Sequence, residues 1–145
     1  MERNIESEKV FEFQGKKYAI VIVNLNWVDA SNYATFIGAH LATIPDEPTN
    51  VFLSFQLRQL GLGGAWIGLN DQDQEGVWIW QSGSTSPFRK WAKGEPNNSR
   101  KGKSKNSKRG DARGEDHVVM RANGEWNDYM GYAHGHAIPF IVEIP

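Results

Sequence analysis

The period of the apolar residues changes along this 145-residue chain, and that change limits the folds it can adopt. Residues 26–61 carry two segments with a helical pattern of apolar side chains. From residue 64 onward the chain offers only short apolar runs, separated by glycine and polar residues, which suit brief strands. We therefore predict one α+β domain over residues 1–145, in which two helices pack on short antiparallel sheets.

Local signals bound the predicted helices. Asn26 is a suitable N-cap with Asp29 at the third helical position, and Gly38 follows the last turn. The apolar face of this first helix is expected to comprise Ala30, Tyr33, Ala34, Ile37 and Leu41. The second helix is predicted to open in residues 44–48 and to run to Gly61.

Strands are predicted on both sides of the helices. Residues 11–17 resemble a hairpin that leads into a strand over residues 18–23, and Pro139 places the start of the last strand at an edge or a bulge. The other predicted strands are residues 65–69, 76–80, 117–120 and 138–144. Five of the six tryptophans fall in strands or motifs, which indicates a core role for Trp66, Trp78, Trp80, Trp91 and Trp126.

Composition excludes several classes of function. A net charge of −1 gives no reason to expect a nucleic-acid partner. With no cysteine there is no disulfide, thiolate zinc site or cysteine nucleophile. No stretch is long and apolar enough to span a membrane, and no apolar segment follows Met1–Asn4, so we expect neither a transmembrane segment nor a signal peptide in this sequence.

Oxygen-bearing side chains gather at three places in the predicted loops between strands. Calcium takes six to eight oxygen ligands, mainly from carboxylates and amide carbonyls, and each cluster offers both kinds. The clusters are residues 70–75, residues 95–98, and residues 115–116 together with 126–128. Each cluster taken alone would more often be turn or packing chemistry than a set of metal ligands, so their order and spacing matter.

Glu95-Pro96-Asn97 suggests how such a site would treat a sugar. If the Glu95–Pro96 peptide bond is cis, the Glu95 and Asn97 oxygens can point to the same side. A carboxylate accepts the proton of a metal-bound hydroxyl, and an amide donates to one of its lone pairs. Glu115 and Asn127 could treat a neighbouring hydroxyl in the same way, and Asp128 would add negative charge for the cation.

Five ordered motifs give the chain a specific resemblance to the C-type lectin domain family. They are Trp66-Ile67-Gly68-Leu69, Glu95-Pro96-Asn97, Gly114-Glu115-Asp116, Trp126-Asn127-Asp128 and Phe140-Ile141-Val142-Glu143. Residues 38–44 resemble the segment that follows the first helix of the family. The resemblance covers nearly the whole chain and implies the C-type-lectin-like fold with its long calcium-binding loop region.

The resemblance also implies a ligand set. It assigns one principal calcium ion, and with it the sugar, to Glu95, Asn97, Glu115 and Asn127, with Asp128 completing the metal site. The Glu-Pro-Asn motif implies mannose-type sugars with equatorial 3- and 4-hydroxyls, such as mannose, fucose, glucose and N-acetylglucosamine. A second, auxiliary calcium would fall to Asp71, Glu75, Asn98 and Asp116, where Asn98 replaces the usual carboxylate and should weaken the ion.

Two departures from the family stand out. The usual cysteine positions correspond to Ala34, His117, Gly131 and Val142, and a disulfide in such a domain typically contributes about 2–4 kcal/mol that packing must replace. Residues 99–114 carry seven basic residues and one acidic residue, so this segment has a net charge of +6 and the rest of the chain −7. We expect a flexible solvated insertion there; the alternative is an electrostatic arm for an anionic partner.

The sequence thus predicts a non-enzymatic, calcium-dependent lectin for glycans or glycoproteins. Self-association would add avidity to a shallow single site. A calcium module of ordinary extracellular strength, at about 10⁻⁴–10⁻³ M, favours a secreted or cell-surface setting. Two alternatives remain: a protein-binding adhesion module of the same fold, and a glycosidase built on a carboxylate pair, although carboxylates neutralised by calcium lack the raised pKa of a catalytic acid.

Overall fold

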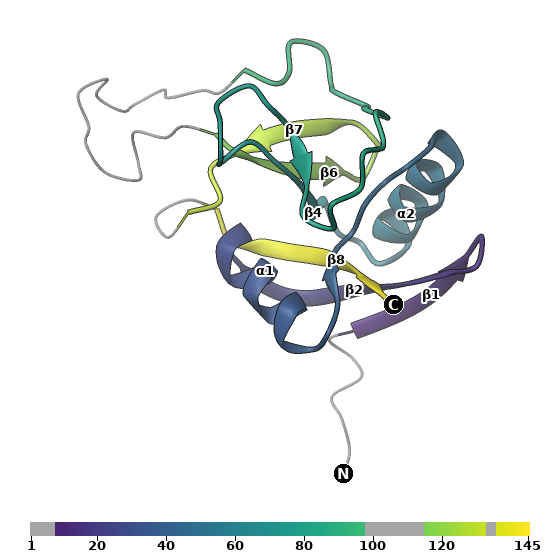
Figure 1. Ribbon diagram of the computed structural model, residues 1–145. Coiled ribbons are helices and arrows are strands. Elements are labelled where there is room, and N and C mark those ends of the chain that lie inside the picture. Colours follow the sequence, from purple (N-terminus) through teal and green to yellow (C-terminus); the bar gives the residue numbers. More distant parts are fainter. Residues whose placement is uncertain (1–7, 98–114, 133–135) are drawn as a thin grey trace.

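The computed structural model describes residues 8–97, 115–132 and 136–145, and within these ranges the chain is an α+β domain (Figure 1). Its elements in order are β1 (Glu8–Phe13), β2 (Lys16–Leu25), α1 (Trp27–Phe36), β3 (His40–Leu41), α2 (Glu47–Gln59), β4 (Gly64–Asn70), β5 (Ile79–Trp80), β6 (His117–Arg121), β7 (Trp126–Tyr129) and β8 (Ile138–Ile144). Neither helix of the described residues is long and apolar enough to cross a membrane.

The strands form one sheet with two antiparallel parts. Its order is β1-β2-β8-β4-β6-β7, with β3 paired to β8 and β5 paired to β4. The two parts meet at β8 and β4, which run parallel and share a single pair, Trp66 and Phe140. In Figure 1, β1, β2 and β8 lie below, and β4, β6 and β7 lie above. The pairing of β2 with β8 joins the two ends of the described chain.

The last strand begins at a bulge. Ile138 pairs with Leu25 and Phe140 pairs with Val21, so several β2 residues lie opposite Pro139. Proline cannot donate to a regular ladder, and the irregularity removes the need for that hydrogen bond. Of the two placements expected for Pro139, an edge or a bulge, the structure has the bulge.

Helix α1 begins at the predicted cap but ends before the predicted apolar face is complete. The Asn26 side chain accepts a hydrogen bond from the Asp29 backbone N–H at 2.8 Å, and Gly38 leaves the helix with φ of +80°. Ile37 is 46% exposed and Leu41 lies in β3, so the expectation that both belong to the buried helical face was wrong. Trp27 joins Ala30 and Ala34 on that face instead.

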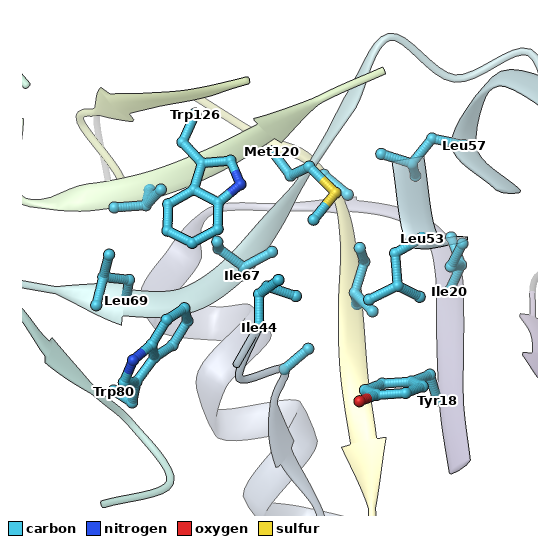
Figure 2. Close-up of a cluster of buried hydrophobic side chains, with 14 residues drawn as sticks. Tyr18, Ile20, Ile44, Leu53, Leu57, Ile67, Leu69, Trp80, Met120 and Trp126 are labelled. Atoms are coloured by element: carbon cyan, nitrogen blue, oxygen red, sulfur yellow. The ribbon is translucent and has the colours of Figure 1, made fainter. Parts of the chain in front are cut away.

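Helix α2 supplies one wall of the larger core. The Asp46 side chain caps it by accepting from the Thr49 N–H at 3.0 Å. Leu53 and Leu57 turn inward toward Ile20 and Met120, as Figure 2 shows. These apolar contacts hold the helix against both parts of the sheet, because Ile20 lies in β2 and Met120 in β6.

Trp80 and Trp126 lie in this core, as predicted, but Trp126 belongs to an unexpected strand. Trp126 is fully buried, and its ring meets the Trp80 ring edge-on at 5.8 Å (Figure 2). Its indole N–H donates to Asn50 Oδ1 at 2.8 Å, which satisfies the only polar atom of the ring. Trp126 belongs to β7, whereas the sequence placed it in a loop.

The strand predicted over residues 76–80 is shorter than expected. Only Ile79 and Trp80 pair with β4. Gly76 has φ of +84° and belongs to the turn that precedes the strand, so the apolar residues after it do not continue a ladder. Trp78 instead packs at the margin of the core, edge-on to the Trp91 ring.

The four positions where the family resemblance places cysteines are held by apolar packing and by one hydrogen bond. Ala34 and Val142 are fully buried in the same apolar cluster. His117 is also fully buried, and its Nδ1 accepts a hydrogen bond from the Gly131 backbone N–H at 3.2 Å. The His117–Gly131 contact therefore joins β6 to the segment after β7 without a covalent bond.

Gly131 leaves no room for a side chain, which gives a direct test of this contact. A Cβ atom at Gly131 would lie 2.4 Å from Trp27 Cβ and 2.7 Å from His117 Nδ1. We expect Gly131→Ala to lower the free energy of unfolding by about 1–3 kcal/mol, as overpacking typically does. Urea unfolding measures the effect, and Gly63→Ala is the control because nothing lies within 4 Å of its added Cβ. Equal stability of both variants would contradict the described packing.

Candidate metal centre

The segment before Glu95 is fastened to β7, and this fixes where the Glu-Pro-Asn motif lies. The Trp126 N–H donates to Lys90 O and the Ala92 N–H donates to Trp126 O, each at 2.9 Å. These bonds lay residues 90–92 beside the start of β7. The chain then reaches Glu95, whose peptide bond to Pro96 is cis, as the sequence analysis proposed.

Three of the predicted principal ligands come together through hydrogen bonds. Asn97 Nδ2 donates to Glu95 Oε2 at 3.2 Å, so the amide and the carboxylate do lie on the same side of the cis bond. The Asn97 backbone N–H donates to Asp128 Oδ1 at 3.1 Å. The motif is thereby linked to the third position of β7, 31 residues away in sequence.

Asn127 and Asp128 lie on strand β7 rather than in a loop, which corrects the sequence-based expectation. They pair with Val119 and Val118 of β6, and both are almost fully buried. A strand paired along its length holds these two side chains more firmly than a loop would. Glu115 is half-buried and stands two residues before the start of β6.

Two oxygens of this first cluster are buried without a donor. Glu95 Oε1 and Asn127 Oδ1 have no hydrogen-bond partner. Burying such an atom unsatisfied typically costs about 1–3 kcal/mol, so native proteins do so where another group completes the site. Oxygens that lack a proton donor are suited to accept a cation.

The negative charge of the cluster acts on Glu95. Burial raises the pKa of Glu95 to about 7, and a hydrogen bond with Asp128 and the charges of Asp128 and Glu115 act in the same direction. Glu115 is thus near enough for its charge to act on Glu95. A cation among these groups would favour their ionised forms.

A second cluster lies beside the start of β6, where Asp116 precedes His117. Asp71, Glu75 and Asp116 each place a carboxylate oxygen within 4.8 Å of the other two. The Asp71 N–H donates to Asp116 O at 3.0 Å, and the Gly76 N–H donates to Asp71 Oδ2 at 2.8 Å. Three of the four residues expected for an auxiliary ion therefore meet; Asn98 lies outside the described residues, as does segment 99–114.

The second cluster also contains buried oxygens without donors, Asp71 Oδ1 and Asp116 Oδ1. Burial raises the pKa of Asp116 to about 7, helped by a hydrogen bond with Asp71 and by the charges of Asp71 and Glu75. A hydrogen bond between two carboxyl groups exists only when one of them holds a proton. When both are ionised, neither Oδ1 has a donor, and the site needs another positive partner.

The groups around Asp116 include residues that the sequence analysis did not assign to the site. The Tyr132 hydroxyl donates to Asp116 Oδ2 at 2.9 Å. His117 Nε2 lies 2.9 Å from Gln72 Oε1. Gln72 directly follows Asp71 in the chain. Gln72 lies in the oxygen-bearing cluster of residues 70–75 but was not assigned a role there, and no motif marks Tyr132. His117 stands in a usual cysteine position, which is the only signal that the sequence gives for it.

The ligand chemistry of both clusters is that of a hard cation. The gathered atoms are carboxylate and amide oxygens in irregular arrangements, which Ca²⁺ accepts more readily than Mg²⁺, because Mg²⁺ demands near-octahedral geometry. Thiolate ligands are absent from the whole chain, since it has no cysteine. The residues present therefore fit calcium.

Comparison with known proteins agrees with this geometry. The family model for the lectin C-type domain matches residues 23–134. The low affinity immunoglobulin epsilon Fc receptor of Mus musculus is 30% identical over 125 residues, which are 86% of this chain and 33% of the receptor. Lectin BRA-3 of Megabalanus rosa is 36% identical over 89 residues, which are 60% of this chain and 53% of that lectin. The chain thus spans about a third of the mouse receptor and about half of Lectin BRA-3.

A solved structure shows the same architecture. The cow C-type carbohydrate-recognition domain of CD23, determined in the presence of a GlcNAc2Man3 oligosaccharide, has a TM-score of 0.75 at 25% identity. The likeness covers 92% of this chain and 91% of that domain. The relatives are lectins, receptors and collectins, which supports the prediction of a binding module rather than an enzyme. Since the family model covers more than half of the sequence, this protein belongs to the C-type lectin family.

Proposed function

We propose that this domain binds mannose-type glycans through a calcium ion held by five residues, namely Glu95, Asn97, Glu115, Asn127 and Asp128. The observation that carries the proposal is the pair of buried oxygens without donors, Glu95 Oε1 and Asn127 Oδ1. They belong to a cluster rich in carboxylates, and the residue types match the ligand positions of the family. A divalent cation would satisfy both oxygens at once and offset the crowded negative charge.

The proposed recognition step uses two hydroxyl groups of one sugar ring. Bound calcium would supply open coordination positions for their oxygens. The Glu95 carboxylate then accepts the proton of one hydroxyl, and the Asn97 amide donates to it. These two groups already lie 3.2 Å apart on one side of the chain, so a hydroxyl can bridge them at the cost of their mutual hydrogen bond. Glu115 and Asn127 are proposed to act likewise on the second hydroxyl.

We further propose that Asp71, Glu75 and Asp116, together with Asn98, hold an auxiliary calcium. The two unpartnered Oδ1 atoms and the mutual approach of three carboxylates support this assignment. Asp71 and Asp116 come from the ends of two paired strands, so the ion would tie the loop after β4 to β6. Residues 1–145 are proposed to form a single carbohydrate-recognition domain.

The proposed setting is extracellular or on a cell surface, where calcium is abundant enough for a site of ordinary strength. Self-association is proposed as the source of avidity. One solved relative, the Kupffer cell receptor Clec4f, is described as trimeric and is 30% identical with a TM-score of 0.73. The competing function is a protein-binding adhesion module that does not bind sugars. That function does not account for the buried oxygens without hydrogen-bond partners in both clusters.

Exchanging the motif residues should exchange the preferred sugar. We expect the wild-type domain to be retained on mannose-agarose in calcium and released by a chelator. The double variant Glu95→Gln/Asn97→Asp should lose at least about tenfold in mannose affinity, equivalent to about 1.4 kcal/mol, and gain binding to galactose. Glu12→Gln on the exposed part of β1 is the matched control and should behave as wild type. Unchanged preference of the double variant would contradict the roles of Glu95 and Asn97.

The raised pKa values predict opposite effects of pH on the metal-free and the calcium-loaded domain. The folded pKa of Asp116, about 7, lies above the ordinary value of 3.8 for an aspartate, so the stability linked to this group is fully present below pH 3.8 and is lost as pH rises through 7. We expect the metal-free domain to be less stable at pH 8 than at pH 5.5. Calcium should remove this loss at pH 8.

Calcium binding should show the complementary dependence. A proton on Glu95 or Asp116 competes with the metal, so the affinity should fall about tenfold for each pH unit below 7 at either cluster. Thermal unfolding with and without calcium, and calcium titrations at several pH values, measure both effects. Calcium affinity that stays constant between pH 5 and pH 8 would exclude these carboxylates as ligands.

A further inference from the structure

His117 is held by aromatic rings on several sides, so its orientation is set by the core. Its ring stacks on Trp27 with centroids 4.5 Å apart and an interplanar angle of 28°. It also meets the Trp66 and Tyr132 rings edge-on at 6.4 and 4.7 Å. The side chain is fully buried. A ring confined in this way presents its two nitrogens in fixed directions.

The hydrogen bonds of the ring define its tautomer. A backbone N–H can only donate, and the Gly131 N–H points at Nδ1 from 3.2 Å, so Nδ1 carries no proton. Nε2 then carries the proton and donates to Gln72 Oε1 at 2.9 Å. The glycine is essential here, because a Cβ at position 131 would lie 2.7 Å from the same nitrogen.

The residues that contact His117 are themselves next to, or bonded to, members of the carboxylate cluster of Asp71, Glu75 and Asp116. Gln72 follows Asp71 directly, and Asp116 precedes His117 in the chain. Tyr132, whose ring lies against His117, donates its hydroxyl to Asp116 Oδ2. The three carboxylates repel one another when ionised, so the cluster needs external contacts to stay within 4.8 Å before a cation arrives.

We propose that His117 is a positioning residue for this cluster. By donating from Nε2 to Gln72, it holds the loop that begins at Asp71 against β6, and so sets the distance from Asp71 to Asp116. The inference rests on the proposed binding of calcium by the cluster. It adds a role for a side chain that contacts no cation itself and stands where the family resemblance places a cysteine. Contacts of this kind orient metal ligands and raise the affinity of the site.

The test compares two glutamines of the same exposed loop. Gln72→Ala removes the acceptor of the His117 proton, whereas Gln74→Ala removes an exposed side chain of the same type two residues away. Each protein is titrated with calcium chloride alone, and the backbone NMR signals of Asp71, Glu75 and Asp116 report the dissociation constant of this cluster. We expect Gln72→Ala to weaken it about tenfold, and Gln74→Ala to change it less than about twofold.

Imidazole ¹⁵N spectra report the protonation of each ring nitrogen of His117, which a purely structural role would leave unchanged between the variants. In the wild-type domain, Nδ1 of His117 should be unprotonated, and the Nε2 proton should exchange slowly with water. Gln72→Ala should speed that exchange while urea unfolding stays close to wild type. His117→Phe, if it folds, should abolish the effect of Gln72→Ala on calcium affinity.

The outcomes separate the inference from the proposed function. Calcium binding to the cluster that is equal in wild type and in Gln72→Ala overturns the role of His117 and leaves the calcium site standing. A proton on Nδ1 of His117 also overturns it. Failure of the wild-type cluster to bind calcium would show in the first titration, before any variant is compared, and would sink the proposed auxiliary site itself.

Discussion

Both candidate calcium sites depend on side-chain oxygens that the fold buries without a hydrogen-bond donor. Glu95 Oε1 and Asn127 Oδ1 in one cluster, and Asp71 Oδ1 and Asp116 Oδ1 in the other, are shielded from water and lack a hydrogen-bond partner. Buried polar atoms of this kind destabilise a folded chain unless something positive reaches them. The sheet can offset this destabilisation because β6 and β7 are paired along their length and packed against the tryptophan-rich core. A rigid framework therefore holds the proposed ligands in place for a cation.

The same framework explains how a C-type lectin domain dispenses with disulfides. Ala34 and Val142, at two of the usual cysteine positions, are buried in one apolar cluster, so dispersion and burial stabilise these parts of the chain. His117 and Gly131 keep a direct contact, now a hydrogen bond under stacked aromatic rings. Because that hydrogen bond fixes the ring, Nε2 of the imidazole points toward Gln72 Oε1. His117, at a position where the family resemblance places a cysteine, is thus proposed to take a second role next to the candidate calcium ligands.

Much of the architecture could be predicted from local rules. Asn26 and Asp46 cap their helices through their own side chains, Gly38 ends α1, and the Glu95–Pro96 bond is cis, since each feature depends on a few neighbouring residues. The candidate ligand residues could be chosen from the sequence because the motifs have a characteristic order. Their meeting in space follows from the strand pairing that the order implies, and the approach of Asn97 to Asp128 illustrates it.

The remainder depends on contacts between distant segments. Asn127 and Asp128 have low strand propensity, yet they lie in β7 because pairing with β6 overrides that preference. Ile37 shares the period of a buried face but lies past the turn where the helix ends. The contacts of His117 with Gln72 and of Tyr132 with Asp116 join residues 45 and 16 positions apart, and no local pattern reveals them.

The most direct measurement is a calcium titration followed by tryptophan fluorescence, carried out with and without a saturating methyl mannoside. If the sugar binds to the metal, it must tighten calcium binding by the same factor by which calcium tightens sugar binding. We expect a lower dissociation constant for calcium with the mannoside and no change with a methyl galactoside. Identical calcium curves in all three conditions would show that sugar and cation do not share a site.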